Sequence, residues 1–313
     1  MYFFSNEEKE KLTGFFLPKS REMQVSEDLR GWNWTRPPLE PMYDINLTIS
    51  EVSSRYCPNG RDLFLRRVAG LKLPPNEVMV SGNFFHSILS DFVIISKKSI
   101  FVFGNNLNSL TKELQSTIPL ILERNLKKVE SPFLRKTLEE KGRAILDYEL
   151  RSLCYRFQET ISRQPNIGAD SLVFQVLPVV VEQKVDGSRL GLSPFLSCDA
   201  FYSFEPVIID LKFGSKRDFH ILGPAGYALV FESLFSFPVN LCCLVYVSFL
   251  QDQLKIEKEF HLISDEVRMR FIEERDEKMR MVYEEIDPGV PNECSRYCQY
   301  LSQCQPGRIF EDR

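Results

Sequence analysis

Short apolar segments in the second half of the chain predict five β-strands. They cover residues 172–183, 191–204, 207–213, 239–249 and 254–263. Each segment is rich in β-branched and aromatic side chains and is bounded by turn residues, as strands are. Only Gln251-Asp252-Gln253 separates the last two segments, which predicts a hairpin. The apolar run 224–235, with Pro224 near its start, predicts a helix between the third and fourth strands.

Helical patterns dominate the chain before these strands. Apolar residues over 76–103 predict a helix that carries His86. The charged segment 109–163 predicts a long helical stretch with breaks near Pro119 and Pro132, because proline interrupts the hydrogen bonds of a helix.

Capping residues and irregular sequence mark the ends of the predicted core. Ser50 is a candidate N-cap for a helix that begins near Ile49, and Ser264 caps a final charged helix that ends near Ile286. Residues 1–48 are crowded with aromatic residues and prolines, which predicts an irregular N-terminal arm.

The fold class that follows is α/β, or mixed α+β, with a mixed sheet of about five strands flanked by helices. The expected organisation is an N-terminal arm at 1–48, a core domain at 49–286 with a helical insertion at about 109–163, and a cysteine-containing tail at 287–313.

Composition narrows the class of protein. A hydrophobic content of 43% and a charged content of 26% are ordinary for a globular chain. No apolar run approaches the length of a membrane span and acidic residues follow the short apolar start at once, so the sequence predicts a cytoplasmic archaeal or bacterial protein. The net charge of −4 argues against a protein that coats DNA. It leaves room for a local basic channel, and basic residues do cluster at Arg61, Arg66 and Arg67 and at Lys212, Lys216 and Arg217.

An acidic motif in the third predicted strand is the main candidate for catalysis. In Asp210-Leu211-Lys212, the strand period of two places the carboxylate and the ammonium on one face. Asp199, at the end of the preceding predicted strand, is placed to add a second carboxylate. Such oxygen ligands suit Mg²⁺ or Mn²⁺, and Lys212 would stabilise developing charge. Taken alone, an Asp-x-Lys pair is more often an exposed ion pair worth less than about 1 kcal/mol, and a single histidine such as His86 is seldom a ligand.

The cysteines fall into two groups. Without a secretory signal, eight cysteines do not indicate a disulfide framework. Four lie in apolar runs, where a buried thiol behaves as a small hydrophobe: Cys154, Cys198, Cys242 and Cys243. The other four are Cys294-x3-Cys298-x5-Cys304 and, far upstream, Cys57. A zinc site and unconnected thiols are the alternatives here, although zinc sites favour Cys-x2-Cys pairs, which the chain lacks.

The order of these motifs resembles the RecB-type nuclease core of the PD-(D/E)xK superfamily. The matching residues, in chain order, are Gly82-x-x-x-His86, Asp199, Asp210-x-Lys212 and Tyr227. The resemblance implies that His86, Asp199 and Asp210 bind a divalent metal ion together with the backbone carbonyl of Leu211. It also implies that Lys212 is catalytic, acting with Asp199 and Asp210.

The helix after Lys212 departs from the family pattern. The family often has a glutamine followed four residues later by a tyrosine that handles DNA. Tyr227 is present here, but Gly223 occupies the glutamine position, and His220 is the candidate substitute.

The cysteine spacing resembles the iron–sulfur staple of RecB-family nucleases. That resemblance implies a 4Fe–4S cluster held by Cys57, Cys294, Cys298 and Cys304. The commoner tail spacing in those proteins is x2 and then x5, whereas this chain has x3 and then x5. A cluster here would close a long loop and couple its assembly to folding.

Four longer segments narrow the resemblance to the archaeal-type CRISPR-associated exonucleases, the Csa branch of the fourth Cas family found with type I-A systems. They lie at 53–58, 185–193, 210–214 and 219–229, and the resemblance spans about residues 50–304. It implies a metal-dependent DNA exonuclease that trims single-stranded ends and processes spacer precursors in CRISPR adaptation. The implied partners are DNA, the CRISPR integrase and other adaptation proteins; no membrane is implied, and oligomerisation stays open.

Two other functions compete with this one. The first is a non-catalytic subunit of the adaptation complex that reads DNA ends or protospacer motifs, and the second is a zinc-stabilised DNA-binding protein. The intact set of His86, Asp199, Asp210 and Lys212 favours the enzyme, because a scaffold has no need for such an acidic cluster. Three aromatic residues are candidates for stacking on unpaired bases, although core packing is their commoner role: Trp32, Trp34 and Phe84.

Overall fold

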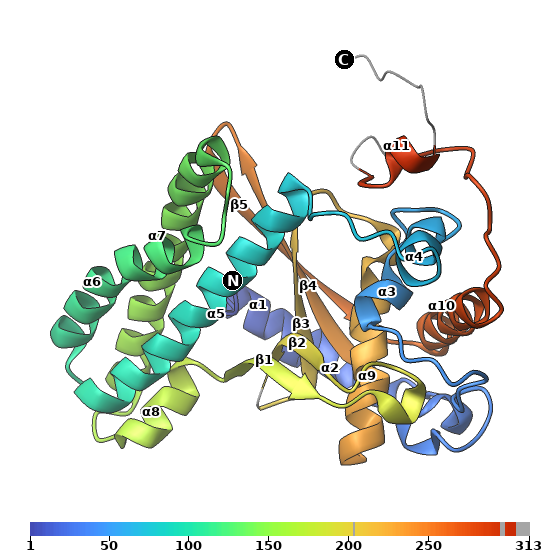
Figure 1. Cartoon of the computed structure of the whole chain (residues 1–313). Coiled ribbons are helices and arrows are strands. Elements are labelled where there is room, and N and C mark those ends of the chain that lie inside the picture. The colour runs from blue at the N-terminus through green and yellow to red at the C-terminus, as the bar shows by residue number, and fades with distance from the viewer. Residues whose placement is uncertain (203, 295–297, 305–313) are drawn as a thin grey trace.

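A five-stranded mixed sheet forms the centre of the computed structural model, which describes residues 1–202, 204–294 and 298–304 (Figure 1). The strands are β1 (Val179–Val185), β2 (Leu196–Tyr202), β3 (Val207–Phe213), β4 (Leu241–Leu250) and β5 (Gln253–Leu262), and they neighbour one another in sequence order. Only β3 and β4 are parallel, and the other neighbours are antiparallel. The predicted mixed α/β fold with about five strands and the hairpin between the last two are therefore confirmed.

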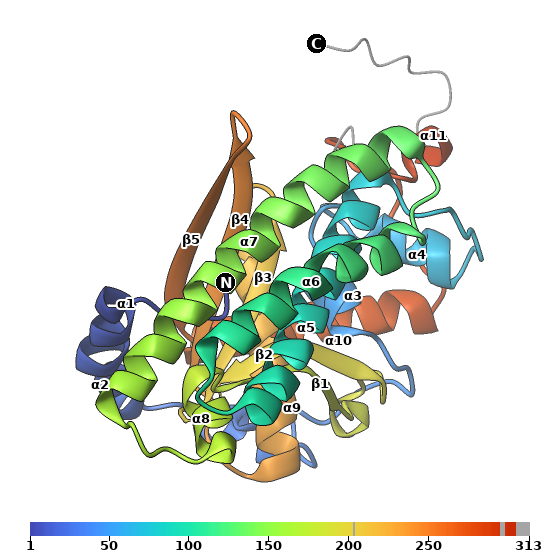
Figure 2. The same cartoon turned by 90° about the vertical axis from the view of Figure 1, so that its left-hand side faces the viewer.

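Helices cover both faces of this sheet (Figures 1 and 2). One layer consists of α5 (Glu77–Phe103), α6 (Leu107–Leu126), α7 (Pro132–Arg163) and α8 (Ala169–Val176). The other consists of α3 (Ile49–Ser53), α4 (Arg61–Arg67), α9 (Leu222–Phe235) and α10 (Asp265–Tyr283). Side chains of β3 alternate between the two faces of the sheet and so contribute to two hydrophobic cores. Ile209 and Leu211 pack with the α5 layer, whereas Ile208 packs with the α9 layer.

The N-terminal segment is more regular than predicted. Residues 6–22 form α1 (Asn6–Lys11), a π-helical turn (Leu12–Phe16) and α2 (Leu17–Glu22). The aromatic residues before α1 are buried, and the Lys258 ammonium on β5 donates to the carbonyl of Phe3 and pairs with Glu8 at 2.8 Å. The N-terminal ammonium of Met1 pairs with the buried carboxylate of Glu149 on α7. The segment is thus an integral part of the core.

Three element predictions were wrong in detail. The break expected near Pro119 is absent, because α6 continues through this proline to Leu126. Residues 172–176 of the first predicted strand belong instead to the helix α8, because Leu172 and Val176, four apart, face the α5 layer on one side of a helix. The cap of α3 is Thr48 rather than Ser50: Thr48 and Glu51 each accept a hydrogen bond from the other's backbone N–H.

The helix α5 is the one described helix that is long and apolar enough to cross a membrane by length and composition. Core helices of other proteins pass the same test, and here α5 lies between the sheet and α6, α7 and α8 (Figure 2).

A buried ionic network ties the α9 layer together. The carboxylate of Glu232 on α9 is fully buried and accepts from Arg268 at 2.8 and 2.9 Å and from Arg30 at 2.8 Å. It also accepts from the backbone N–H groups of Gly31, at 2.9 Å, and Val239, at 3.0 Å. A Cβ atom at position 31 would lie 2.0 Å from a backbone oxygen of α9, so glycine permits this close approach.

Candidate active site

Asp199 lies at the point where β2 and β3 separate. The antiparallel ladder between the two strands ends at Ala200 and Ile209. Beyond this pair, the N–H of Leu211 donates to Oδ2 of Asp199 at 2.9 Å. A carboxylate therefore replaces the missing strand partner and is held next to the Asp210 segment.

An irregularity in β1 lies opposite Asp199. The register of β1 and β2 pairs the residues on either side but skips Glu182 and Asp199, and Glu182 has a φ of 51°, which is uncommon for a residue other than glycine. Cys198 packs with the α9 layer and Ala200 with the α5 layer, although they are two residues apart. Irregularities of this kind re-aim side chains beside active sites. The Glu182 carboxylate, which accepts from Ser197 Oγ at 2.7 Å, adds negative charge here.

Asp210 and Lys212 form an ion pair on one face of β3, as the strand period predicts. Oδ2 of Asp210 lies 2.6 Å from Nζ of Lys212, and Asp210 is only 6% exposed. Burial raises the pKa of Asp210, and the neighbouring Asp199 raises it further against the opposing effect of Lys212. Burial alone would lower the pKa of Lys212, but the charges of Asp210 and Asp199 outweigh this effect and raise it. Lys212 is therefore a cation at neutral pH.

His86 reaches the same place from α5. Its Nδ1 lies 3.6 Å from Oδ1 of Asp199, and its ring packs edge-on against Phe213 of β3 at 5.1 Å. The structure thus brings His86 of the distant helix α5 together with Asp199, Asp210 and Lys212 of the consecutive strands β2 and β3.

The donor chemistry of this group fits a divalent cation, since it offers one imidazole and two carboxylates. Oδ2 of Asp210 is buried and has the Lys212 ammonium as its partner, without an aligned hydrogen bond. As the side chains stand, however, no three His, Cys, Asp or Glu residues within the described ranges are arranged to hold a metal ion. A cation here would compete with Lys212 for Asp210.

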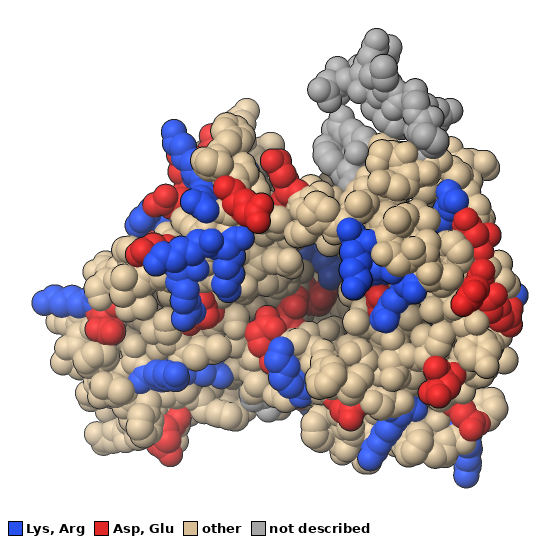
Figure 3. Space-filling model, viewed as in Figure 1, with Lys and Arg blue, Asp and Glu red and all other residues tan. Residues whose placement is uncertain are grey.

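A hollow opens in the middle of the face shown in Figure 3, between the α5 layer and the α3–α4 side of the molecule. Acidic side chains lie on its floor, and lysine and arginine side chains lie on both of its sides. The basic clusters predicted from the sequence are largely neutralised: Arg66 and Arg67 both pair with Glu51, and Lys216 pairs with two glutamates of β5.

The two residues predicted to handle DNA are both engaged within the protein. The hydroxyl of Tyr227 donates to the carbonyl of Ser197 and so fixes α9 to β2. His220 is 5% exposed, with Nε2 3.2 Å from the hydroxyl of Tyr56 and Nδ1 3.4 Å from the hydroxyl of Tyr246. DNA handling by Tyr227 and His220 stays a prediction.

The buried His220 should make stability depend on pH. Burial, with a smaller contribution from Lys212, lowers the pKa of His220 to about 4, so the unfolded chain binds a proton between pH 6.5 and 4 that the folded chain does not. The stability that the neutral, buried His220 contributes is complete above pH 6.5 and is lost as the pH falls towards 4. We expect urea unfolding of His220→Gln to show a weaker decline in stability across this interval than the wild type; equal slopes would contradict this.

The described part of the cysteine-containing tail (287–294 and 298–304) docks on the Cys57 loop, residues 54–60, and on the residues that follow this loop. Arg61 pairs with Asp287 at 2.8 Å, Asn59 donates to the carbonyl of Gly289 at 2.9 Å, and the hydroxyl of Tyr300 donates to the carbonyl of Leu71 at 3.1 Å. Each contact joins the segment 57–71 to the segment that follows α10.

This docking brings three of the four predicted cluster cysteines near one another. Burial raises the pKa of Cys298, and the nearby thiols of Cys57 and Cys304 raise it further, with Asp62. Cys304 lies in the short helix α11 (Leu301–Cys304), and Cys294 is described but not its three following residues. As with the acidic group, the described thiols do not form a ready metal-binding set of three.

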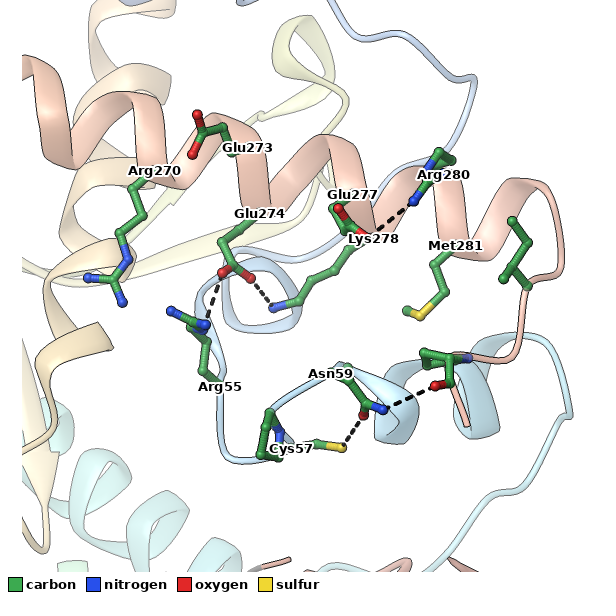
Figure 4. Close-up of a pocket in the computed structure, with 14 residues that line it drawn as sticks. Arg55, Cys57, Asn59, Arg270, Glu273, Glu274, Glu277, Lys278, Arg280 and Met281 are labelled. Carbon is green, nitrogen blue, oxygen red and sulfur yellow. Dashed lines mark hydrogen bonds and ion pairs between the residues drawn. The ribbon is translucent and has the colours of Figure 1, made fainter. Parts of the chain in front are cut away.

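A pocket of about 500 Å³ lies between the Cys57 loop and α10 (Figure 4). Glu274 on α10 bridges Arg55 and Lys278 at 3.2 Å each along its wall. This pocket is separate from the candidate active site, because its lining does not include His86, Asp199, Asp210 or Lys212.

Comparison with known protein families shows which family the chain belongs to. The family profile described as "CRISPR-associated exonuclease Csa1" matches residues 3–307. The chain belongs to the Csa1 family. The CRISPR-associated exonuclease resemblance drawn from the sequence is therefore confirmed at this level, while the PD-(D/E)xK core and the iron–sulfur cluster stay predictions.

Two Csa1 relatives match over nearly their full length. A protein of Saccharolobus solfataricus (strain ATCC 35092 / DSM 1617 / JCM 11322 / P2) named CRISPR-associated exonuclease Csa1 is 30% identical over 290 residues, which cover 93% of this chain and 94% of the relative. A protein of the same name from Thermoproteus tenax is 25% identical over 282 residues, covering 90% and 92%. No solved structure matches the chain.

Three residues near the candidate active site of this Csa1 chain were not predicted from the sequence. Tyr56 and Tyr246 flank His220, and Glu182 faces Asp199. The position of Tyr56 directly before Cys57 was the available signal for the first, and the acid within the first strand was the signal for Glu182. Phe84, a candidate for base stacking, is instead buried.

Proposed function

We propose that this chain is a Mg²⁺- or Mn²⁺-dependent deoxyribonuclease that trims single-stranded DNA ends and processes spacer precursors in CRISPR adaptation. The observation that carries the proposal is the convergence of His86, Asp199, Asp210 and Lys212 at the separation of β2 and β3. Membership of a family of CRISPR-associated exonucleases supports it.

The residues of the site have different roles in phosphodiester hydrolysis. His86, Asp199 and Asp210, with the carbonyl of Leu211, would hold the cation, which when bound supplies an activated water and neutralises negative charge on the phosphate. Lys212, which lies beside Asp210, stabilises charge that develops on the phosphate oxygens. Asp199 also holds the N–H of Leu211, which keeps β3 in position.

The test is digestion of DNA labelled at one end, with Mg²⁺, with Mn²⁺ and with a chelator. We expect stepwise shortening of single-stranded DNA with either metal ion and none with the chelator. Labels placed at the 5′ and the 3′ end in turn give the direction. Binding of DNA ends without cleavage under every condition would favour the non-catalytic end-reading subunit instead.

We also propose that Cys57, Cys294, Cys298 and Cys304 hold a 4Fe–4S cluster. The docking of the tail on the Cys57 loop supports this, because it brings together thiols that are distant in sequence. The role we assign to the cluster is structural, since it would fasten the end of the chain to residue 57.

Replacement of Cys57 by alanine should remove the iron. Iron content is expected to fall from about four atoms per chain to fewer than about one, with loss of the visible absorption of the cluster. The matched control is Cys154→Ala, since Cys154 lies on α7 beside Thr111 and away from the tail. A Cys57→Ala protein that is well folded and keeps its iron contradicts the assignment.

In this proposal the partners are DNA ends, the CRISPR integrase and other adaptation proteins. The pairing of Arg66 and Arg67 with Glu51 reduces the free positive charge on that side of the hollow. Co-purification of the full chain with the integrase, with and without DNA, tests the association.

A further inference from the structure

Tyr56 is an exposed aromatic residue held in a fixed position beside the candidate active site. Its side chain is 56% exposed, yet its ring packs edge-on against Phe219 at 5.0 Å and 87°. Its hydroxyl lies 3.2 Å from Nε2 of His220. The aromatic contact and the polar contact together hold the exposed ring in one position.

The anchors of Tyr56 lead directly to the acidic group. Nδ1 of His220 lies 3.4 Å from the hydroxyl of Tyr246, whose ring tilts against the imidazole at 5.7 Å. Tyr246 on β4 is the register partner of Lys212 on β3. Because His220 is buried and its pKa is lowered to about 4, it is neutral at physiological pH, so one ring nitrogen donates and the other accepts.

Tyr56 also lies close to the charges of the site itself. Only the imidazole of His220 separates its hydroxyl from that of Tyr246, the neighbour of Lys212 across β3 and β4. A phosphate bound at Lys212 therefore has a rigid, half-exposed aromatic ring near it.

We propose that Tyr56 contacts the nucleic acid directly and stacks on an unpaired base next to the phosphate that is cleaved, with Phe219, His220 and Tyr246 holding its ring. The inference rests on the proposed nuclease function and adds a source of substrate preference to it. Only an unpaired base exposes its flat face to a side chain, so this contact favours single-stranded ends over blunt duplex ends.

The test combines changes in the protein with changes in the DNA. Steady-state cleavage of a short single strand is measured with the full chain in Mn²⁺. We expect Tyr56→Ala to raise KM about 10-fold with kcat within about twofold of wild type, the range expected for loss of one stacked base. Tyr56→Phe keeps the ring and should raise KM by less than about threefold.

An abasic substrate decides whether the ring contacts a base. Oligonucleotides that each lack one base near the cleaved end are compared. At one position the missing base should raise KM for the wild type by about the same 10-fold factor as Tyr56→Ala does. For Tyr56→Ala, the missing base at that position should cause no further rise in KM. Tyr155→Ala is the control, because Tyr155 on α7 is 61% exposed. It should behave as wild type with every substrate.

The outcomes separate the two proposals. If the wild type cleaves DNA but the effects of Tyr56→Ala and of every abasic position add independently, stacking is overturned and the nuclease function stands. If Tyr56→Phe is as defective as Tyr56→Ala, the hydroxyl and not the ring matters, and stacking is again overturned. If the wild type neither binds nor cleaves DNA, both proposals fail. Thermal unfolding of each variant excludes loss of the fold as the cause.

Discussion

Replacement of Asp210 by asparagine should reduce DNA cleavage by about 10² to 10³-fold, the size of effect seen when one charge-stabilising group is lost from an active site. Asparagine preserves the shape of the side chain, so β3 and its packing should survive. The change removes the negative charge that pairs with Lys212 at 2.6 Å and that would bind the cation. Single-turnover rates over a series of Mn²⁺ concentrations measure both the cleavage rate and the apparent affinity for metal.

The matched control is Asp170→Asn, which neutralises an exposed aspartate in the first turn of α8. We expect its cleavage rate to equal that of the wild type. Equal rates for Asp210→Asn and wild type would place the nuclease activity elsewhere. An unchanged metal affinity with a reduced rate would assign Asp210 a role other than ligand.

Replacement of Glu232 by glutamine should lower the free energy of unfolding by about 3–5 kcal/mol, because two guanidinium groups would lose their shared counter-charge inside the protein. Arg268 is fully buried and Arg30 nearly so. Glutamine would also present an amide to one of the donors that now point at the carboxylate. The expected result is a large decrease in the urea midpoint with an unchanged dependence on denaturant.

Glu139→Gln serves as the control for this effect. Glu139 pairs with Arg143 at 4.0 Å on the surface of α7, where both side chains are about half exposed. Such a pair contributes less than about 1 kcal/mol. Similar small shifts for both variants would show that burial does not make the Glu232 network important.

The sheet was largely predictable because strands β2 to β5 consist of β-branched and aromatic residues between turn residues. Val207–Phe213 was predicted with its observed bounds. The error at α8 has a physical cause: Leu172, Val173 and Val176 are apolar and partly β-branched, and only contact with α5 decides that they form a helix. The helices of the N-terminal segment were not predicted, because the residues that they pack against lie on distant strands.

The candidate site was predictable where the signal is local. The two-residue spacing of Asp210 and Lys212 determines their common face from sequence alone. The 3.6 Å approach of His86 to Asp199 came only through family resemblance, since it depends on how α5 lies across the sheet. The sequence marks Glu182 only as an acid in a strand and Tyr56 only as the residue before Cys57. Their position at the site depends on a left-handed backbone angle and on a neighbour 164 positions away, which the local sequence does not show.

The contacts of the N-terminal segment also set an order of events during synthesis. The carbonyl of Phe3 is bound by Lys258, 255 residues later, and Arg30 by Glu232, 202 residues later. At a translation rate of about 5–20 residues per second, roughly 13 to 50 s separate the emergence of Phe3 from that of Lys258. For that time the β5 side of its docking site is missing, although Glu149 on α7 has already been made, and the apolar segment is open to chaperones on the nascent chain. Closure of the N-terminal segment over β5 is thus a late step, taken when nearly the whole polypeptide has been made.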